Sequence, residues 1–249
     1  PAGLKAADTA ALRGHEVTLF EKRALGGYLH EASYPEFKAD IRDALKYLVT
    51  QVNKHGVKVV EKEAALEDLK GFDAVIVAAG TTPAGLRVPG ADRPEVSIAV
   101  DALRPDGIRP TGEIVVIGGG LIGVETAIQF SRTEGNHVTI IEMLPQIMNG
   151  CSDCDHIVYT DWIREKNIRV CTCARVTEIG EEGVTFEAGG RRQTVPADHV
   201  FLATGMKPCG GLYEQLCAEG VKAYIVGDCQ TPGKIYDAIH SGYKAGLKV

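Results

Sequence analysis

One pattern occurs twice in this chain of 249 residues, and it limits the possible folds more than any other feature. Residues 115–142 contain an apolar stretch, a glycine-rich turn, a helix-like stretch and a second apolar stretch that ends in Glu142. Residues 1–21 follow the same course from the glycine onward and end in Glu21. Apolar runs that alternate with helix-like runs are typical of a parallel α/β sheet covered on both faces. The duplication therefore predicts two Rossmann-like dinucleotide-binding units.

Two such units imply two dinucleotides, which indicates an electron-transfer flavoprotein rather than a simple dehydrogenase. Residues 81–112 are rich in proline and glycine, as is typical of a connector. We expect residues 1–107 plus 195–249 to form an FAD-binding domain, with residues 108–194 inserted as an NAD(P)H-binding domain. The first unit begins at Pro1, after the point where its first strand and first two glycines would stand. We therefore expect that strand to be missing from its sheet and flavin affinity to be reduced.

Two further patterns predict local structure. Residues 36–55 carry large apolar side chains at spacings of three and four, which predicts a long amphipathic helix. Residues 168–176, 184–188 and 192–197 have the composition of strands and are separated by glycine turns. They predict a small antiparallel piece on the second unit.

The second unit carries a glycine triplet directly after a strand and at the start of a helix. Gly118 permits a tight turn, Gly120 lets a pyrophosphate approach the backbone, and Gly123 lets the helix pack on the strand. Glu142 ends the next strand, where a carboxylate accepts hydrogen bonds from both ribose hydroxyls. Because Glu142 repels a 2′-phosphate and no Lys or Arg follows within five residues, we expect NADH rather than NADPH. The predicted contacts are Gly118, Gly120, Leu121, Ile122, Gly123 and Glu142.

The first unit repeats part of this arrangement. Gly3 matches the third glycine and Glu21 matches the ribose acid. Lys22 either flanks the adenosine or is a solvated lysine. Gly26 and Gly27 form a turn whose backbone either passes close to a pyrophosphate or is a plain loop. These residues predict the adenosine and phosphate side of a flavin site.

Small residues near strand ends extend the predicted flavin site. Ala79 and Gly80 follow one strand and Gly205 follows its counterpart, and their size lets the chain cross beneath a nucleotide. Gly227 and Asp228 follow the last strand, just before a helix at 234–247. Asp228 is expected to bond the ribityl chain of a flavin, although Gly-Asp is also a common turn. The positive end of the following helix favours negative charge on a reduced flavin.

The motifs VIVAAGTTP, VVIGGGLIGVE, FLATGMKP, IVGDC and DAIHSGYKAG occur in this order along the chain. Together they resemble the C-terminal half of the multidomain NADH:flavin oxidoreductases. This group includes 2,4-dienoyl-CoA reductase, enoate reductase and trimethylamine dehydrogenase. The resemblance covers essentially the whole chain and implies a pyridine nucleotide-disulfide oxidoreductase-like fold with FAD and NADH as cofactors.

The same resemblance implies a partner and a direction of electron flow. Family members carry an N-terminal TIM barrel with FMN and a four-iron cluster. NADH would reduce FAD, and electrons would pass through the cluster to FMN, where a conjugated C=C bond is reduced. This chain would be the electron-input half only, and as a fragment without the substrate site it would be inactive as an enoyl or dienoyl reductase by itself. No catalytic side chain is predicted, because hydride transfer to a flavin needs alignment rather than a protein acid or base.

Two alternative functions remain open from the sequence. One is a structural nucleotide-binding domain without hydride transfer, as in the amine dehydrogenases of this group. The other is a stand-alone NADH:acceptor reductase that uses Cys151 and Cys154 as a thiol pair. Those two residues with Cys171 and Cys173 also suggest a four-sulfur zinc site, but the second pair is one residue short of the usual spacing, so no metal site is predicted.

Composition excludes several classes of protein. The net charge of −6 and a pI of about 5.7 argue against a nucleic-acid partner, which requires a basic face. No apolar run reaches the length of a membrane span, so no membrane role is expected. Seven cysteines, an odd number in a chain too large to need disulfide bonds, indicate reduced thiols in the cytoplasm.

Overall fold

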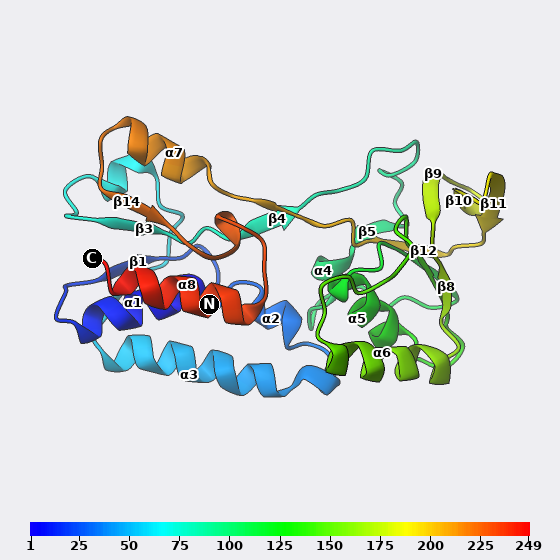
Figure 1. Ribbon diagram of the computed structural model, residues 1–249, viewed down its shortest axis with the longest axis horizontal. Coiled ribbons are helices and arrows are strands. Elements are labelled where there is room, and N and C mark those ends of the chain that lie inside the picture. The colour runs from blue at the N-terminus through cyan, green and yellow to red at the C-terminus, as the bar shows by residue number, and fades with distance from the viewer. The chain divides into compact units, whose positions relative to one another are not determined.

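A computed structural model describes residues 1–249 and divides them into two compact units (Figure 1). Unit 1 comprises Pro1–Thr82 and Met206–Val249, and unit 2 is the continuous segment Pro83–Gly205. Both units combine parallel strands with helices, which confirms the predicted α/β class of Rossmann type.

The unit boundaries differ from the predicted domain boundaries. The segments 83–107 and 195–205 lie in unit 2 rather than with the flanking residues. Hydrogen bonding explains this, because β5 (Val96–Ile98) pairs in parallel with β12 (His199–Leu202), and β12 pairs with the first long strand of unit 2. The segments 83–107 and 195–205 therefore each contribute one strand to the sheet of unit 2.

Unit 2 is built on a five-stranded sheet in the order β5-β12-β6-β7-β8. Its central strands β6 (Glu113–Ile117) and β7 (His137–Ile141) pair in parallel, and β8 (Arg169–Cys171) forms the edge beside β7. The apolar residues of β6 and β7 are almost fully buried, as expected for parallel strands covered on both faces. The helices of this unit are α4 (Ala99–Ala102), α5 (Leu121–Phe130) and α6 (Asp153–Glu165).

The predicted antiparallel piece of unit 2 is confirmed. It has the order β11-β10-β9, formed by β9 (Ala174–Gly180), β10 (Gly183–Ala188) and β11 (Arg191–Val195). The single strand predicted at 168–176 is wrong, because Cys173 adopts a left-handed conformation with φ of 50° and separates β8 from β9. Phe186 on β10 packs into the same core as the main sheet.

The strands of unit 1 form separate parallel pairs. β1 (Thr18–Phe20) pairs with β2 (Lys58–Val60), and β3 (Val75–Val77) pairs with β14 (Ala223–Ile225). The two pairs are not hydrogen-bonded to each other and form separate two-stranded sheets. A third pair, β4 (Thr81–Pro83) and β13 (Met206–Pro208), lies where the chain passes between the units.

Helices complete unit 1. The α-helices are α1 (Ala2–Leu12), α2 (Leu29–Ala32), α3 (Asp40–Lys54), α7 (Gly211–Ala218) and α8 (Ile235–Gly246), and the 3₁₀ helices are η1 (Glu36–Lys38), η2 (Leu66–Leu69) and η3 (Gly227–Cys229). Helix α3 begins later than the predicted 36–55 because η1 precedes it. Its residues Leu48 and Val52 form a core with Leu4 of α1.

Helices α1 and α8 pack unusually closely in unit 1. A Cβ built on Gly242 of α8 would lie 2.2 Å from the carbonyl oxygen of Ala2. A Cβ on Gly246, one turn later, would lie 2.7 Å from Cβ of Thr9. The two glycines therefore allow the backbones of the two helices to approach each other, and this contact fixes where α8 begins relative to α1.

Candidate dinucleotide-binding sites

The glycine-rich turn of unit 2 joins the end of β6 to the start of α5. A Cβ on Gly123 would lie 2.0 Å from the carbonyl oxygen of Gly118, and a Cβ on Gly118 would lie 2.3 Å from that of Ala203. Both positions therefore require glycine for close backbone packing. At Gly120, in contrast, no atom lies within 4 Å of the Cβ position. This open space above a bare backbone fits a pyrophosphate.

The first turn of α5 faces the same open space. Gly120 is its N-cap residue, no side chain caps the helix, and no acidic residue occupies the first turn. The amides of Leu121 and Ile122 belong to this uncapped turn, where helical amides have no intrahelical acceptor. Such a helix end attracts an anion through its N–H groups and its dipole.

Glu142 is held rigidly beside the turn. Its Oε2 atom accepts the Gly119 N–H at 2.6 Å, and its Oε1 atom accepts the Leu144 N–H at 2.7 Å. The residue is only 8 % exposed. Each carboxylate oxygen has lone pairs beyond the one used by the backbone. The group can therefore accept ribose hydroxyl protons, whereas a 2′-phosphate would meet a fixed negative charge.

The loop after β7 packs against the glycine turn of unit 2, a contact that was not predicted from the sequence. The Met148 N–H donates to the carbonyl oxygen of Gly119 at 2.7 Å, and Met148 is buried with φ of 56°. A Cβ on Gly119 would lie 2.4 Å from Cγ2 of Ile147. Gly119 was the sequence signal for this contact. The dinucleotide motif requires glycine at 118 and 120 but not at 119, so a third glycine there indicates close packing by another segment.

Met143 and Leu144 were also absent from the predicted NADH contacts. They follow Glu142 directly and are 67 % and 46 % exposed. The Leu144 carbonyl accepts the Cys173 N–H at 3.0 Å, which fixes the backbone at this point. Two large apolar side chains therefore stand in solvent next to the ribose acid.

In unit 1, several predicted residues gather near the start of α1 and the ends of β3 and β14. A Cβ on Gly3 would lie 3.2 Å from Cβ of Ala78, and a Cβ on Gly227 would lie 2.7 Å from Cβ of Ala2. Ala79 is exposed, and the Cβ position of Gly80 is open. The backbone is therefore open after β3, whereas Gly227 after β14 packs closely against Ala2.

Glu21 and its neighbours lie at the end of β1. The Oε1 atom of Glu21 accepts the Arg23 N–H at 2.9 Å. Lys22 forms an exposed ion pair with Glu63, with 2.7 Å between Nζ and Oε1. Gly26 has φ of 127°, and a Cβ there would lie 2.3 Å from Cδ1 of Leu45, so this position requires glycine.

Asp228 lies on η3 and is half-buried. Burial raises the pKa of its carboxyl group. Its Oδ1 atom accepts the Gly233 N–H at 3.3 Å, and the N–H of Lys234 at the start of α8 is taken by Asp237 at 2.9 Å. Asp228 is therefore a hydrogen-bonding group close to the start of α8, and its bond to a flavin ribityl chain stays a prediction. The predicted residue Gly205, in contrast, belongs to unit 2 and not to this cluster.

The cysteines are all free. Cys151 and Cys154 flank Ser152, the N-cap residue of α6 in unit 2. No group of three or more His, Cys, Asp or Glu side chains is arranged to hold a metal ion, so the alternative four-sulfur site is not assembled.

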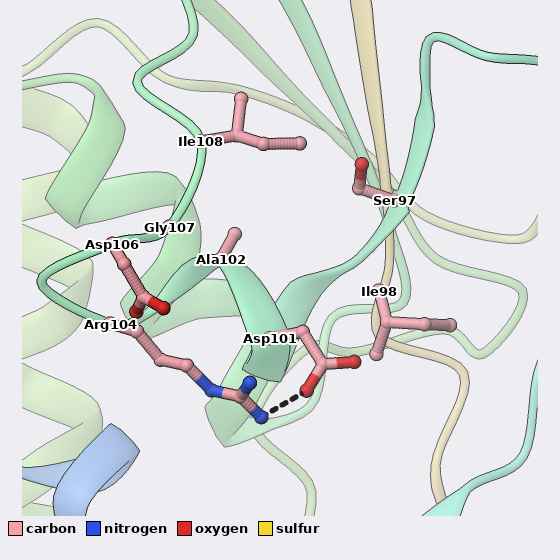
Figure 2. A pocket seen from close by; sticks show the side chains of 8 residues that line it. All are labelled: Ser97, Ile98, Asp101, Ala102, Arg104, Asp106, Gly107 and Ile108. Atoms are coloured by element: carbon pink, nitrogen blue, oxygen red, sulfur yellow. Dashed lines mark hydrogen bonds and ion pairs between the residues drawn. The ribbon is translucent and has the colours of Figure 1, made fainter.

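A separate hollow of about 360 Å³ lies on unit 2 (Figure 2). It is formed by the end of β5, helix α4 and the loop that follows, where Asp101 and Arg104 are paired. None of the predicted cofactor contacts lines it.

Fold and sites together define a protein with two dinucleotide-binding α/β units. Residues 1–231 match the family model described as pyridine nucleotide-disulphide oxidoreductase. The chain belongs to this family, whose cofactors are FAD and NAD(P)H. None of its helices combines the length and hydropathy needed to cross a membrane.

Several known proteins are similar to this chain over nearly its whole length. It is 35 % identical to NADH oxidase of Thermoanaerobacter brockii, covering 100 % of this chain and 40 % of that protein. It is 34 % identical to bilirubin reductase of Mediterraneibacter gnavus, covering 98 % and 38 %. A solved structure of 2-naphthoyl-CoA reductase superposes with a TM-score of 0.92 at 29 % identity, covering 100 % and 38 %. The chain thus spans about two fifths of these relatives, and it matches the C-terminal half of multidomain reductases, as the resemblance predicted.

Proposed function

We propose that this chain is the electron-input module of a larger flavoprotein reductase, in which unit 2 binds NADH and unit 1 binds FAD. The observation that carries the proposal is the fixed Glu142 carboxylate beside the open glycine turn. When bound, the two cofactors supply the chemistry, a hydride passing from the nicotinamide to the flavin. The protein binds and aligns them.

In the proposed NADH site, the turn at Gly120 and the start of α5 bind the pyrophosphate, and Glu142 binds the adenosine ribose. Met143 and Leu144 offer the adenine an apolar surface. Because both oxygens of Glu142 are fixed by backbone N–H groups, the carboxylate cannot turn away from a 2′-phosphate, which supports NADH as the preferred donor.

In the proposed FAD site, Glu21 binds the ribose, the open backbone at Gly27 and Gly80 leaves room for the cofactor, and Asp228 bonds the ribityl chain. Gly3 lets the start of α1 pack closely against Ala78. The alternative contact, Lys22, is paired with Glu63 in this structure. Of the remaining predicted contacts, Ala79 is exposed beside Gly80, whereas Gly26 and Gly227 serve the site by close packing against Leu45 and Ala2. Gly205 lies in unit 2 and is not assigned to this site.

The proposed acceptor of the electrons lies outside this chain. By family resemblance it is an N-terminal TIM barrel with FMN and a four-iron cluster that reduces a conjugated C=C bond of an enoyl or dienoyl type. The similarity to larger proteins named bilirubin reductase and 2-naphthoyl-CoA reductase supports such an arrangement.

A stopped-flow experiment without oxygen tests the proposal. The chain is loaded with FAD, desalted and mixed with NADH or NADPH while the visible band of oxidised flavin is followed. We expect NADH to bleach the band faster than NADPH does. A bound flavin that neither nucleotide bleaches would support the structural nucleotide-binding alternative. Full NADH:acceptor activity in Cys154→Ser would exclude the thiol-pair alternative, whereas loss of that activity with an intact NADH site would support it.

A further inference from the structure

Arg23 connects two parts of the candidate flavin site that are separate in the sequence. We propose that Arg23 is a positioning residue, which couples the proposed ribose acid Glu21 to the Gly26–Gly27 turn through an ion pair with the buried Glu31. The inference rests on the proposed assignment of FAD to unit 1. It adds a residue that the glycine and acid motifs do not include.

The first connection uses the backbone. The Arg23 N–H donates to Oε1 of Glu21 at 2.9 Å, and the Glu21 N–H donates to the carbonyl oxygen of Val60 at 3.1 Å. The carboxylate is therefore oriented by the residue two positions later. This bond does not depend on the Arg23 side chain.

The second connection uses the guanidinium group. It pairs with Oε1 of Glu31 on α2, and it also lies 5.8 Å from the ring centre of Tyr28. The Glu31 side chain is 1 % exposed, whereas the Arg23 side chain is 41 % exposed. A carboxylate buried this deeply is costly without a cation close to it. The ion pair therefore holds α2 in its present position.

Helix α2 in turn holds the glycine turn. The Leu29 N–H donates to the carbonyl oxygen of Gly26 at 3.3 Å, and the His30 N–H donates to that of Gly27 at 3.4 Å. Leu29 is buried in the core that includes Leu48 of α3. Movement of Glu31 would move both donors, and with them the backbone that we assign to the pyrophosphate.

Two side-chain variants separate the connections. Arg23→Gln removes the charge but retains the backbone N–H, so Glu21 stays bonded while α2 is released. Arg23→Lys retains the charge and should restore most of the effect. If the single variant folds poorly, the double variant Arg23→Gln/Glu31→Gln is used instead, because it also removes the buried negative charge of Glu31. Lys46→Gln, at an exposed cation elsewhere in unit 1, is the matched control.

Hydrogen exchange without cofactor and FAD binding give two independent readouts. For Arg23→Gln we expect several-fold faster exchange at the Leu29 and His30 amides, unchanged exchange in β6 and α5, and an FAD Kd raised about tenfold. Arg23→Lys and Lys46→Gln should behave as the wild-type protein. Unchanged exchange at these two amides in Arg23→Gln, or an equal loss in Arg23→Lys, would overturn the inference. A wild-type chain that takes up no FAD would instead contradict the proposed function.

Discussion

The Glu142 carboxylate and the Gly119 amide are joined by a hydrogen bond of 2.6 Å, which links the proposed ribose-binding acid of unit 2 directly to the glycine turn. Met148 completes the assembly by donating to the Gly119 carbonyl oxygen at 2.7 Å. The acid is therefore not an isolated side chain at a strand end. Replacing Glu142 therefore also weakens its hydrogen bond to the Gly119 N–H, which holds the glycine turn in place.

Replacing Glu142 tests this relationship. In Glu142→Gln the side-chain amide opposes one of the two backbone N–H donors, and its oxygen is a weaker acceptor for ribose hydroxyls. Because hydrogen bonds to charged groups contribute about 1.5–3 kcal/mol, we expect the NADH Kd to rise about 10- to 100-fold. Fluorescence titration measures this. Glu134→Gln, at an exposed acid of unit 2, should bind NADH as the wild type does.

Two glycines of the same turn should respond differently to alanine. At Gly120 a methyl group meets no protein atom within 4 Å, so Gly120→Ala should leave the stability of unit 2 unchanged while blocking NADH binding. At Gly123 the methyl group would lie 2.0 Å from the Gly118 carbonyl oxygen. Gly123→Ala should therefore destabilise unit 2 by about 1–3 kcal/mol, the usual cost of overpacking. Urea unfolding and NADH titration of both variants distinguish the effects. Normal NADH affinity in Gly120→Ala would contradict the assigned pyrophosphate position.

The glycine turn was predictable because its chemistry is local. Gly118, Gly120 and Gly123 satisfy backbone requirements that depend on a few neighbouring residues, and the spacing shows this directly. The start of α3 was not predictable in the same way. The Arg42 guanidinium group donates to the carbonyl oxygens of Ser33 and Tyr34, and this tertiary contact accompanies a 3₁₀ turn before the helix.

The unit boundaries also depend on contacts between distant residues. The pairing of β5 with β12 brings Val96 beside Val200, and no composition signal in the connector indicates it. The ion pair of Arg23 with Glu31 is likewise invisible to motif analysis, because an Arg and a Glu eight residues apart have no fixed relation without a helix.

Asp8 should make the stability of unit 1 depend on pH. Its buried carboxylate accepts hydrogen bonds from Lys5 at 2.8 Å and His55 at 2.7 Å. Burial alone raises the pKa of Asp8, but these two partners outweigh burial and hold it below its usual value. A lowered pKa means that the ionised carboxylate stabilises the fold above the unfolded-state pKa and that this contribution is lost as the pH falls through the folded-state pKa.

The variant Asp8→Asn checks this contribution. We expect a loss of about 1–3 kcal/mol at neutral pH, from weaker hydrogen bonds to the two partners. The difference from the wild type should persist down to about pH 4 and shrink below it. Urea unfolding over this range measures the difference. A difference that grows as the pH falls would contradict the assigned sign.

The close approach of α1 and α8 gives a prediction in which two effects oppose each other. Alanine favours a helix over glycine by about 1 kcal/mol, so propensity alone would make Gly242→Ala stabilising. The methyl group would, however, lie 2.2 Å from the Ala2 carbonyl oxygen, and overpacking costs about 1–3 kcal/mol. We expect net destabilisation of unit 1. Gly211→Ala on α7, where no atom lies within 4 Å of the Cβ position, should be neutral or stabilising. Thermal unfolding of both variants decides between the two effects.

The most direct test of the account is the mixing of the FAD-loaded chain with NADH in the absence of oxygen, with Gly120→Ala as a parallel sample. We expect the flavin band of the wild-type chain to bleach on addition of NADH. We expect Gly120→Ala, loaded with the same amount of FAD, to keep its oxidised spectrum. Retention of the oxidised band by the wild-type chain, or equal bleaching of both proteins, would rule out electron input from an NADH bound at the glycine turn of unit 2.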